Sequence, residues 1–339
     1  MFQFGSHPSI HDHLYPTVNV RIIKMQTPNP KLAVFSPKTT APVIAKSIEM
    51  QVTRVSDAGT QPLADRLAIE EPLEIRVEFF EGEERKSKSV SITMRTPGHD
   101  EELAAGFLFT EGILRSTDEV VEIIGCGPNT GAGHSQNTVK VRLAPHASVN
   151  LPKLERHFYS TSSCGVCGKA SLDALEVPGL QPIAREGFRI APIEISALQG
   201  KVRAHQSVFD QTGGLHGAAL FTAEGDLLEV REDVGRHNAV DKLLGAQFIS
   251  GKTPLSNCLL FLSGRASFEL VQKALVAGIP MIVAVGAPSS LAVELAKRFN
   301  ITLVGFVRDG RFNIYHGDWR LNSPEIVAAS SNRKFARND

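Results

Sequence analysis

The sequence has only four cysteines among its 339 residues. So few cysteines exclude a disulfide-stapled scaffold and are typical of a reducing compartment, where close cysteines more often react or bind metal. An excess of charge of either sign is also missing, because 36 Lys and Arg are balanced by 36 Asp and Glu. That balance excludes the global basic bias of a nonspecific nucleic-acid binder.

Long hydrophobic runs are absent as well. No stretch approaches the roughly 20 consecutive apolar residues that a membrane-spanning helix needs. The longest apolar runs, such as 281–285, have the length of a strand. The N-terminus also lacks the charged-then-apolar layout of a secretory signal. We therefore expect a cytoplasmic protein that binds neither a membrane nor nucleic acid.

Composition divides the chain into five segments. Prolines interrupt every short apolar run near the N-terminus, and Asp12 is the only acidic residue before Glu49, which is typical of disorder. The predicted segments are a disordered leader at 1–60, a smaller N-terminal α+β domain at 61–155, a cysteine loop and connector at 156–192, an α/β domain at 193–320, and a C-terminal tail at 321–339.

The α+β segment begins with two runs in which polar and apolar residues alternate. A polar connector rich in glutamate separates them, so the pattern predicts a β-hairpin. Helical spacing of apolar residues follows, with acidic residues in the first turn. The predicted elements are strands at 73–80 and 89–94, a helix at 100–114, and strands at 119–124 and 138–143.

The α/β segment alternates strands with helices. Its strands are short continuous apolar runs, which indicates that helices cover both faces of the sheet. Strand–helix–strand repetition predicts a three-layer α/β fold with a parallel or mixed sheet. The predicted helices are 193–209, 237–249, 266–277 and 290–299, and the predicted strands are 216–221, 227–230, 258–262, 281–285, 301–307 and 312–315.

Cys164 and Cys167 are the most reactive candidates in the sequence. Glycines flank them and allow the backbone to approach another molecule closely. A helix predicted to begin near Lys169, together with the lysine itself, favours thiolate over thiol. Four interpretations stay open: a thiol that accepts and passes on sulfur, half of a zinc site, a thioredoxin-type dithiol, or an inert loop. Cys126, in a predicted turn, and Cys258, at the start of an apolar strand, stand alone, which disfavours zinc.

Two junctions between a strand and a helix carry small hydroxyl and glycine residues, at 262–267 and 285–290. Free N–H groups at a helix N-terminus bind phosphate, so Ser263 is a candidate ligand residue and Arg265 a candidate clamp. Serine and glycine also cap helices, and the sequence does not separate the two roles.

The stretch 231–242 holds seven ionisable side chains among twelve residues. Such groups are costly to bury without partners, so we predict either an ion-pair cluster or the polar wall of a pocket. Arg236 immediately precedes the helix predicted at 237–249, which His237 and Asn238 begin. His216, which begins a strand, is a candidate for the same cavity, or alternatively a buried histidine with satisfied hydrogen bonds.

Six motifs together resemble the FdhD family, the formate dehydrogenase accessory sulfurtransferases. The resemblance covers residues 65–319. The motifs are Cys164-Gly-Val-Cys-Gly-Lys169, Gly213-Gly-Leu-His216, Arg231-Glu-Asp-Val-Gly-Arg-His-Asn-Ala-Val-Asp-Lys242, Ser263-Gly-Arg-Ala-Ser-Phe-Glu269, Ala287-Pro-Ser-Ser-Leu-Ala-Val-Glu294 and Gly305-Phe-Val-Arg-Asp-Gly-Arg311.

The resemblance implies a role in sulfur transfer. A cysteine desulfurase would load a sulfane sulfur on Cys164 as a persulfide, with Cys167 assisting. The sulfur would then pass to the molybdenum of bis(molybdopterin guanine dinucleotide), which enters formate dehydrogenase. The resemblance also implies a homodimer with a cytidine-deaminase-like core and no permanent metal. It places cofactor contacts in the late turn, at Phe306, Val307, Arg308, Asp309, Gly310 and Arg311.

Positive side chains are expected to offset the phosphates of such a cofactor; the candidates are Arg236, Lys242, Arg265, Arg308 and Arg311.

Two rival functions remain at this point. A zinc-dependent deaminase would carry His-x-Glu before its Cys-x-x-Cys, whereas here Ala218 stands at the glutamate position and the cysteines precede His216. Deamination is therefore disfavoured. A non-catalytic carrier of the cofactor, which uses the cysteines only for docking, is the second alternative.

Overall fold

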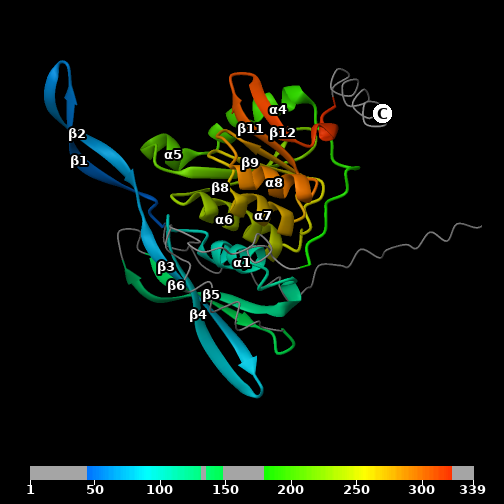
Figure 1. The fold of residues 1–339 in the computed structure, drawn as a ribbon. Coiled ribbons are helices and arrows are strands. Elements are labelled where there is room, and N and C mark those ends of the chain that lie inside the picture. Colours follow the sequence, from blue (N-terminus) through cyan, green and yellow to red (C-terminus); the bar gives the residue numbers. More distant parts are fainter. Residues whose placement is uncertain (1–43, 131–134, 148–178, 323–339) are drawn as a thin grey trace, which may run out of the picture. The chain divides into compact units, whose positions relative to one another are not determined.

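The computed structural model describes residues 44–130, 135–147 and 179–322. Six strands of the C-terminal half form one mixed sheet in the order β12-β11-β10-β9-β7-β8 (Figure 1). The strands β9, β10 and β11 run parallel, whereas β7, β8 and β12 pair antiparallel with their neighbours. The strands are β7 His216–Phe221, β8 Leu227–Asp233, β9 Leu259–Leu262, β10 Met281–Ala284, β11 Thr302–Arg308 and β12 Arg311–His316.

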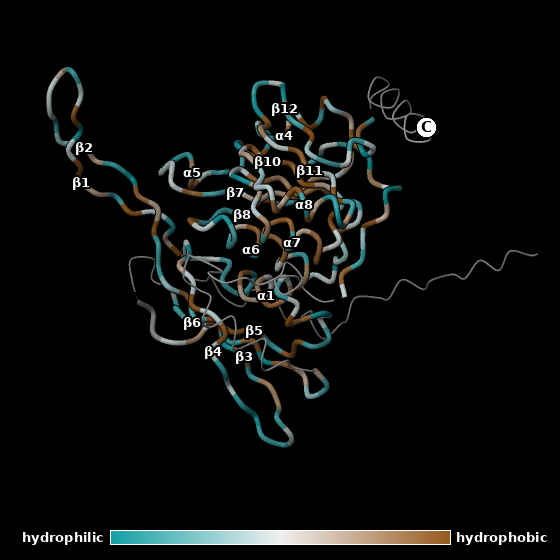
Figure 2. Tube along the Cα trace, in the orientation of Figure 1, coloured by the Kyte–Doolittle hydropathy of each residue, from teal (hydrophilic) through white to brown (hydrophobic). Residues whose placement is uncertain are grey.

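Helices cover both faces of this sheet, as the continuous apolar strands predicted. Every residue of β9 and β10 is buried, and Figure 2 shows hydrophobic residues concentrated in and around β10 and α7. One face packs against α4 and the other against α6, α7 and α8. The helices are α4 Pro192–Arg203, α5 Ser207–Thr212, α6 Arg236–Ile249, α7 Phe268–Val276 and α8 Ser290–Arg298.

The single helix predicted at 193–209 is wrong, because the chain breaks between α4 and α5. Gln206 has non-helical backbone angles, φ −98° and ψ 63°. After the break, α5 begins as a separate helix near β8. There the carboxylate of Glu232 accepts hydrogen bonds from the backbone N–H groups of Val208 and Phe209. A carboxylate from a distant strand thus caps α5, and no local pattern signals that contact.

A second sheet of four strands occupies the N-terminal half, in the order β4-β3-β6-β5. Buried and more exposed residues alternate along β3, as its sequence predicted. Helix α1 packs on this sheet. The elements are β3 Glu71–Glu81, β4 Glu84–Arg95, α1 Asp100–Thr110, the 3₁₀ turn η2 Thr117–Glu119, β5 Val120–Thr130 and β6 Ser135–Leu143.

Helix α1 ends at Thr110, four residues before its predicted end. Gly112 adopts a left-handed conformation with φ 65°. The backbone N–H of Gly112 donates to Phe109 and that of Ile113 donates to Leu108, which closes the helix C-terminus.

The two predicted folded domains share one hydrophobic core. Buried residues of β3 and α1 belong to the same cluster as those of α6, α7 and β9. The contact between α1 and α6 is close because glycines meet there: a Cβ on Gly106 would lie 1.8 Å from the carbonyl oxygen of Asp241, and one on Gly245 would lie 1.8 Å from that of Glu102. A boundary drawn on composition missed this packing between distant segments.

The leader predicted at 1–60 extends too far, because residues 47–56 are a strand. This strand, β1 Ser47–Ser56, pairs antiparallel with β2 Gly59–Ala68. Cross-strand pairing such as Glu49 opposite Arg66 stabilises a hairpin that composition alone does not reveal. Residues 1–43 lie outside the described ranges, so disorder there stays a prediction.

Leu321, predicted as the first residue of the tail, belongs to the folded part instead. The last short element is η3 Asp318–Arg320, and Leu321 after it is fully buried and bridges Ile190. Among the described residues, no helix has the length and apolar character required to cross a membrane.

Replacing Gly106 with Ala tests the close packing of α1 on α6. We expect Gly106→Ala to lower the free energy of unfolding by at least about 2 kcal/mol, because the new methyl group meets backbone that cannot move aside. Urea unfolding measures the change.

Gly200→Ala in α4 is the matched control, because a Cβ there meets nothing within 4 Å. The better helix propensity of Ala is expected to leave that variant unchanged or stabilised by up to about 1 kcal/mol. Equal unfolding midpoints for Gly106→Ala and the unsubstituted protein would contradict the packing.

Candidate functional site

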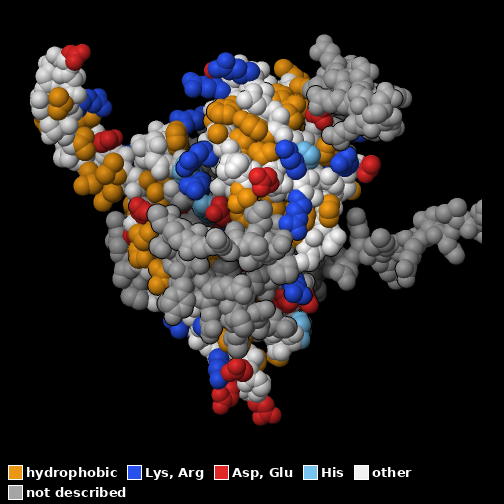
Figure 3. All heavy atoms as spheres, in the orientation of Figure 1, with side chains coloured by type: hydrophobic (Ala, Val, Ile, Leu, Met, Phe, Trp, Pro, Cys, Tyr) orange, Lys and Arg blue, Asp and Glu red, His pale blue; other side chains and the backbone are white. Residues whose placement is uncertain are grey.

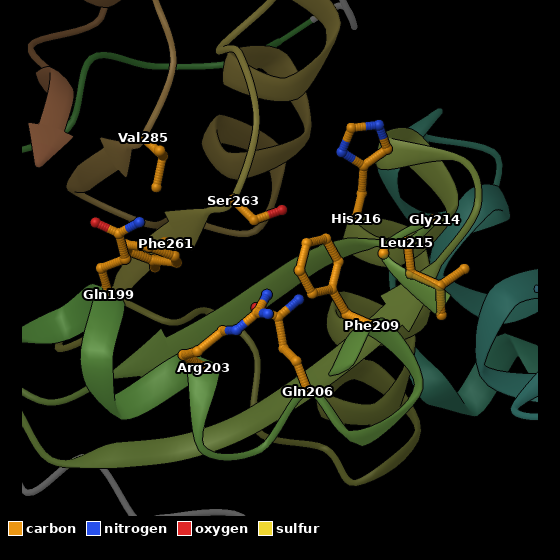
Figure 4. A pocket seen from close by; sticks show the side chains of 11 residues that line it. Gln199, Arg203, Gln206, Phe209, Gly214, Leu215, His216, Phe261, Ser263 and Val285 are labelled. Carbon is orange, nitrogen blue, oxygen red and sulfur yellow. The ribbon is translucent and has the colours of Figure 1, made fainter. Parts of the chain in front are cut away.

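A pocket of about 340 Å³ opens where β9 and β10 end and β7 begins (Figure 4). This volume lies within the range of small-molecule sites, roughly 300–1,000 Å³. The carboxyl ends of parallel strands commonly form ligand sites in α/β proteins. The lining residues are Gln199, Arg203, Gln206, Phe209, Gly213, Gly214, Leu215, His216, Phe261, Ser263 and Val285.

Ser263 and His216, both predicted as site residues, meet in this pocket. The Ser263 hydroxyl accepts a hydrogen bond from the backbone N–H of Gly217 at 2.8 Å, and the Ser263 N–H donates to the carbonyl of Gly217 at 3.0 Å. These bonds fix the end of β9 against the start of β7. Because its oxygen is the acceptor, the hydroxyl proton of Ser263 stays available as a donor.

His216 is half-buried beside Gly264, where a Cβ would lie 3.3 Å from the imidazole Nδ1. Burial lowers the pKa of His216, and the positive charge of Arg236 lowers it further, although Asp233 opposes this. Both effects favour the neutral imidazole, so His216 is a candidate hydrogen-bonding group in the pocket lining.

The N-termini of α6 and α7 lie close together behind His216. Ser267 is the N-cap residue of α7, but its side chain does not cap the helix within the described structure; its hydroxyl lies 3.4 Å from Nε2 of His237. A hydrogen bond from His237 is the main cause that lowers the pKa of Glu269 to about 2. Arg236 has a buried Nε without a hydrogen-bond partner among the described residues. The Glu269 carboxylate also accepts hydrogen bonds from the Ser267 hydroxyl and from its own backbone N–H, so the first turn of α7 already holds a negative charge. The group at this end that suits an anion is therefore Arg236.

At the junction 285–290, the serine hydroxyl caps a helix, which is the structural role that the sequence left open. Ser289 is the N-cap residue of α8, and its hydroxyl accepts a hydrogen bond from the backbone N–H of Ala292 at 3.2 Å. The hydroxyl group at this position therefore caps the helix, whereas that of Ser267 contacts the side chains of His237 and Glu269.

Part of the polar stretch 231–242 is an ion-pair cluster. Lys242, expected to offset ligand phosphates, is 1% exposed. Its Nζ lies 2.7 Å from the buried carboxylate of Asp233 and donates to the carbonyl of Thr96 at 2.7 Å. Asn238 also donates to Asp233. The expectation for Lys242 is wrong, because a buried charge must be paired inside the protein.

The late turn lies partly at the same sheet edge. Phe306 is 48% exposed with a left-handed φ of 56°, and its N–H donates to the carbonyl of Gly286. A left-handed backbone conformation is strained for a residue other than glycine, and here it lies at an irregularity in the pairing of β11 with β12. Val307 is 1% exposed and faces the core, so its side chain is not available to a ligand.

The rest of the turn forms the tip of the β11–β12 hairpin. Arg308 pairs with Asp309 at 3.2 Å, both side chains being more than two-thirds exposed. Gly310 adopts φ 75° at the tip, and Arg311 is exposed. Figure 3 shows basic side chains gathered there. These residues stand beyond the pocket lining.

Arg265 follows Ser263 and is exposed. Its backbone packs against Gly286, where a Cβ would lie 3.0 Å from the Arg265 N and Cα atoms. The close approach joins the loops after β9 and β10, so Arg265 stands between the pocket and Phe306.

Cys164 and Cys167 lie outside the described residues. Cys126, predicted in a turn, is part of β5 at an irregularity in its pairing with β6. Cys258 is partly buried, and burial raises the pKa of its thiol. Within the described ranges, no three His, Cys, Asp or Glu side chains gather to hold a metal ion.

Sequence reasoning missed one wall of the pocket. Gln199 and Arg203 come from α4, Phe209 comes from α5, and Gln206 lies at the break between the two helices. Their types and spacing are those of an ordinary surface helix, which is how the sequence was interpreted, so no sequence signal identified them.

Comparison with known proteins decides the family. The model of the FdhD/NarQ family matches residues 68–322. This chain belongs to the FdhD/NarQ family. It is 50% identical to the sulfur carrier protein FdhD of Streptomyces avermitilis over 273 residues, covering 80% of this chain and 94% of the relative. It is 39% identical to the FdhD protein of Saccharolobus solfataricus over 270 residues, covering 80% and 96%.

A crystal structure of a formate dehydrogenase accessory protein from Desulfotalea psychrophila has a similar fold. The TM-score is 0.63 at 27% identity, covering 83% of this chain and 99% of that protein. The match supports the mixed α/β architecture of this FdhD/NarQ member.

Substituting Arg236 tests the electrostatics of the site in this FdhD/NarQ protein. We expect Arg236→Met to raise the pKa of His216, because removal of a nearby positive charge makes the imidazolium easier to form. An NMR titration of the His216 ring measures the pKa. In the protein with Arg236, the imidazolium population therefore disappears at a lower pH than in the variant.

Arg308→Met is the control, because Arg308 stands at the exposed hairpin tip. That substitution is expected to leave the pKa of His216 unchanged. An equal pKa in the Arg236→Met variant and the unsubstituted protein would contradict the proximity of the two side chains.

Proposed function

We propose that this protein is a sulfur carrier for formate dehydrogenase. It receives a sulfane sulfur from a cysteine desulfurase as a persulfide on Cys164. It then passes the sulfur to the molybdenum of bis(molybdopterin guanine dinucleotide), its substrate. The observation that carries the proposal is the family match over 68–322, a range that contains the cysteine pair and the sheet edge. Relatives of up to 50% identity are named sulfur carrier proteins.

The first transfer follows from thiol chemistry. The Cys164 thiolate attacks the terminal sulfur of the desulfurase persulfide, a new S–S bond forms, and the desulfurase cysteine leaves as thiolate. No net oxidation is required, because the sulfane sulfur changes only its carrier.

Delivery of the sulfur as sulfide needs two electrons. We assign these to Cys167: its thiolate attacks the inner sulfur of the Cys164 persulfide, the S–S bond to the terminal sulfur breaks, and a disulfide is left between the two cysteines. The terminal sulfur departs as hydrosulfide toward molybdenum. A cellular thiol then reduces the disulfide before the next cycle.

The sheet edge is the proposed place for the substrate. The cofactor carries several phosphates, and Arg236 and Arg265 offer donors and positive charge near Ser263 and His216. The exposed Phe306 and the arginines of the late turn extend the same edge. These features support binding of an extended, anionic dinucleotide.

We also propose that the protein is a homodimer, in which each protomer offers one sheet edge to a cofactor with two nucleotides. We further propose that the core resembles that of cytidine deaminases but does not catalyse deamination, because Ala218 stands where that class has its catalytic glutamate.

Intact-mass analysis tests the sulfur transfer. After incubation with a cysteine desulfurase and cysteine, the protein is expected to gain ~32 Da, one sulfur atom, on the peptide that contains Cys164. Cys164→Ala is expected to lose the adduct and to fail to restore formate dehydrogenase activity in cells lacking this protein. Cys258→Ala, which removes a poorly ionised thiol, is expected to keep both.

Full restoration of activity by Cys164→Ala would overturn sulfur transfer and leave the non-catalytic carrier. If Cys164 gains the sulfur adduct but formate dehydrogenase is not activated, the proposed delivery of sulfur to the cofactor is wrong and the loading of Cys164 is retained.

A further inference from the structure

The hairpin of β1 and β2, residues 47–68, exposes large apolar side chains. Among the described strands these two pair only with each other, as Figure 1 shows. Ile48, Met50 and Leu67 are 43%, 49% and 39% exposed. A two-stranded hairpin by itself is marginally stable in water, and clustered exposed apolar groups commonly mark an interaction surface. This ribbon, the arm, therefore needs a surface to pack against.

The pairing register gathers the apolar residues of the arm on one face. Successive residues of a strand point to opposite faces, and residues directly opposite each other share a face. One face, the apolar face, carries the opposed pairs Ile48–Leu67, Met50–Asp65, Val52–Leu63 and Arg54–Gln61. The other face carries Glu49, Gln51, Thr53, Val55, Thr60, Pro62, Ala64 and Arg66. Only the apolar face thus has a continuous stripe of large apolar side chains.

The base of the arm is fixed to α5. The Ser47 hydroxyl and the Arg66 guanidinium donate to the side-chain oxygen of Gln211 at 3.3 and 3.2 Å. Helix α5 also contributes to the pocket lining. Farther along the arm, Met50 and Arg54 stay exposed. The arm is therefore anchored at one end and open along its apolar face.

Two opposite charges flank the centre of the apolar face. Arg54 lies two residues beyond Val52, and Asp65 lies two residues from Leu63 toward the base. Within the described ranges neither charge forms an ion pair. The two lie four residue positions apart along the arm, about 13 Å at roughly 3.3 Å per residue, so they do not reach each other in one chain. Each charge is available to a second molecule.

This arrangement is complementary to a second copy of itself, turned antiparallel. When two apolar faces meet about a two-fold axis at Val52 and Leu63, the row that holds Asp65 faces the row that holds the partner's Arg54, and the reverse contact forms as well. In a parallel arrangement Arg54 would instead meet the partner's Arg54, and Asp65 the partner's Asp65. Like charges would then repel, so the charge pattern selects the antiparallel arrangement.

We propose that the arm joins two copies of this chain, through antiparallel packing of their apolar faces and reciprocal pairing of Arg54 with Asp65. The inference rests on the homodimer of the proposed function and names a contact surface for it. It does not depend on the sulfur chemistry. Because the base of each arm is bonded to α5, the contact links the pocket-lining helices of the two protomers.

A charge at the centre of the apolar face tests the contact. Leu63→Asp is expected to weaken dimerisation of the full chain at least about a hundredfold, because the dimer would bury the new carboxylate twice. Ala64→Asp is the matched control, because Ala64 is exposed on the other face of the same strand. It is expected to leave the dissociation constant unchanged. Sedimentation velocity over a range of protein concentrations measures that constant.

A charge exchange separates contact between chains from a loss of folding. Arg54→Asp leaves only acidic groups at the two ion pairs, and Asp65→Arg leaves only basic ones. Each variant alone is expected to dimerise about tenfold more weakly than the unsubstituted protein. Mixed in equal amounts, the two are expected to form heterodimers with nearly the original affinity, because acidic groups of one chain then face basic groups of the other at both pairs. Native mass spectrometry distinguishes the heterodimer from either homodimer by mass.

If the protein is a dimer that Leu63→Asp leaves intact, or if the mixed charge variants form no heterodimer, the arm contact is wrong and the homodimer is retained. An unsubstituted protein that stays monomeric refutes both. None of these results affects the mass adduct on Cys164. Conversely, heterodimers of the charge variants without that adduct would refute sulfur transfer and retain the arm contact.

Discussion

The close crossing of α1 over α6 is the contact on which the rest of this structure depends. Gly106 and Gly245 let the two backbones touch, and any side chain at either position would force the helices apart. This contact joins the four-stranded sheet to the six-stranded sheet through a shared hydrophobic core. It also fixes α6 under β7 and β8, so the α6 N-terminus reaches the sheet edge where Ser263 and His216 meet.

Two buried charges on consecutive residues of α6 reinforce that position from different sides. Asp241 lies 3.0 Å from Nζ of Lys273 in α7 and accepts a hydrogen bond from Thr110 of α1 at 2.8 Å. Lys242 pairs with Asp233 of β8. Removing one partner of a buried pair leaves the other charge uncompensated, which is strongly destabilising. The polar residues of this stretch therefore have two different roles. Asp241 and Lys242 hold the helix in place, whereas Nε of Arg236 has no hydrogen-bond partner within the described ranges.

The pocket combines chemistry from elements that are far apart in sequence. The ends of β9 and β10 provide hydroxyl and backbone groups, Arg236 provides a positive charge beside His216, and α4 with α5 provides the opposite wall. In the proposed function, the persulfide chemistry belongs to Cys164 and Cys167, whose thiols would require only accessibility and partial ionisation to exchange sulfur.

The sequence by itself determined the strands and most helices of the α/β half, because a buried strand must be apolar throughout and an exposed helix face must be polar. It also identified the cysteine pair, the family, and the site candidates Ser263, Arg265 and His216, because these lie in motifs at recognisable junctions. Only the tertiary structure decided that Lys242 and Val307 face inward, that 47–56 is a strand, and that Gln206 lines the pocket from the break between α4 and α5. The physical reason is that burial and pairing depend on which distant segment packs against a residue, and local periodicity carries no information about that partner.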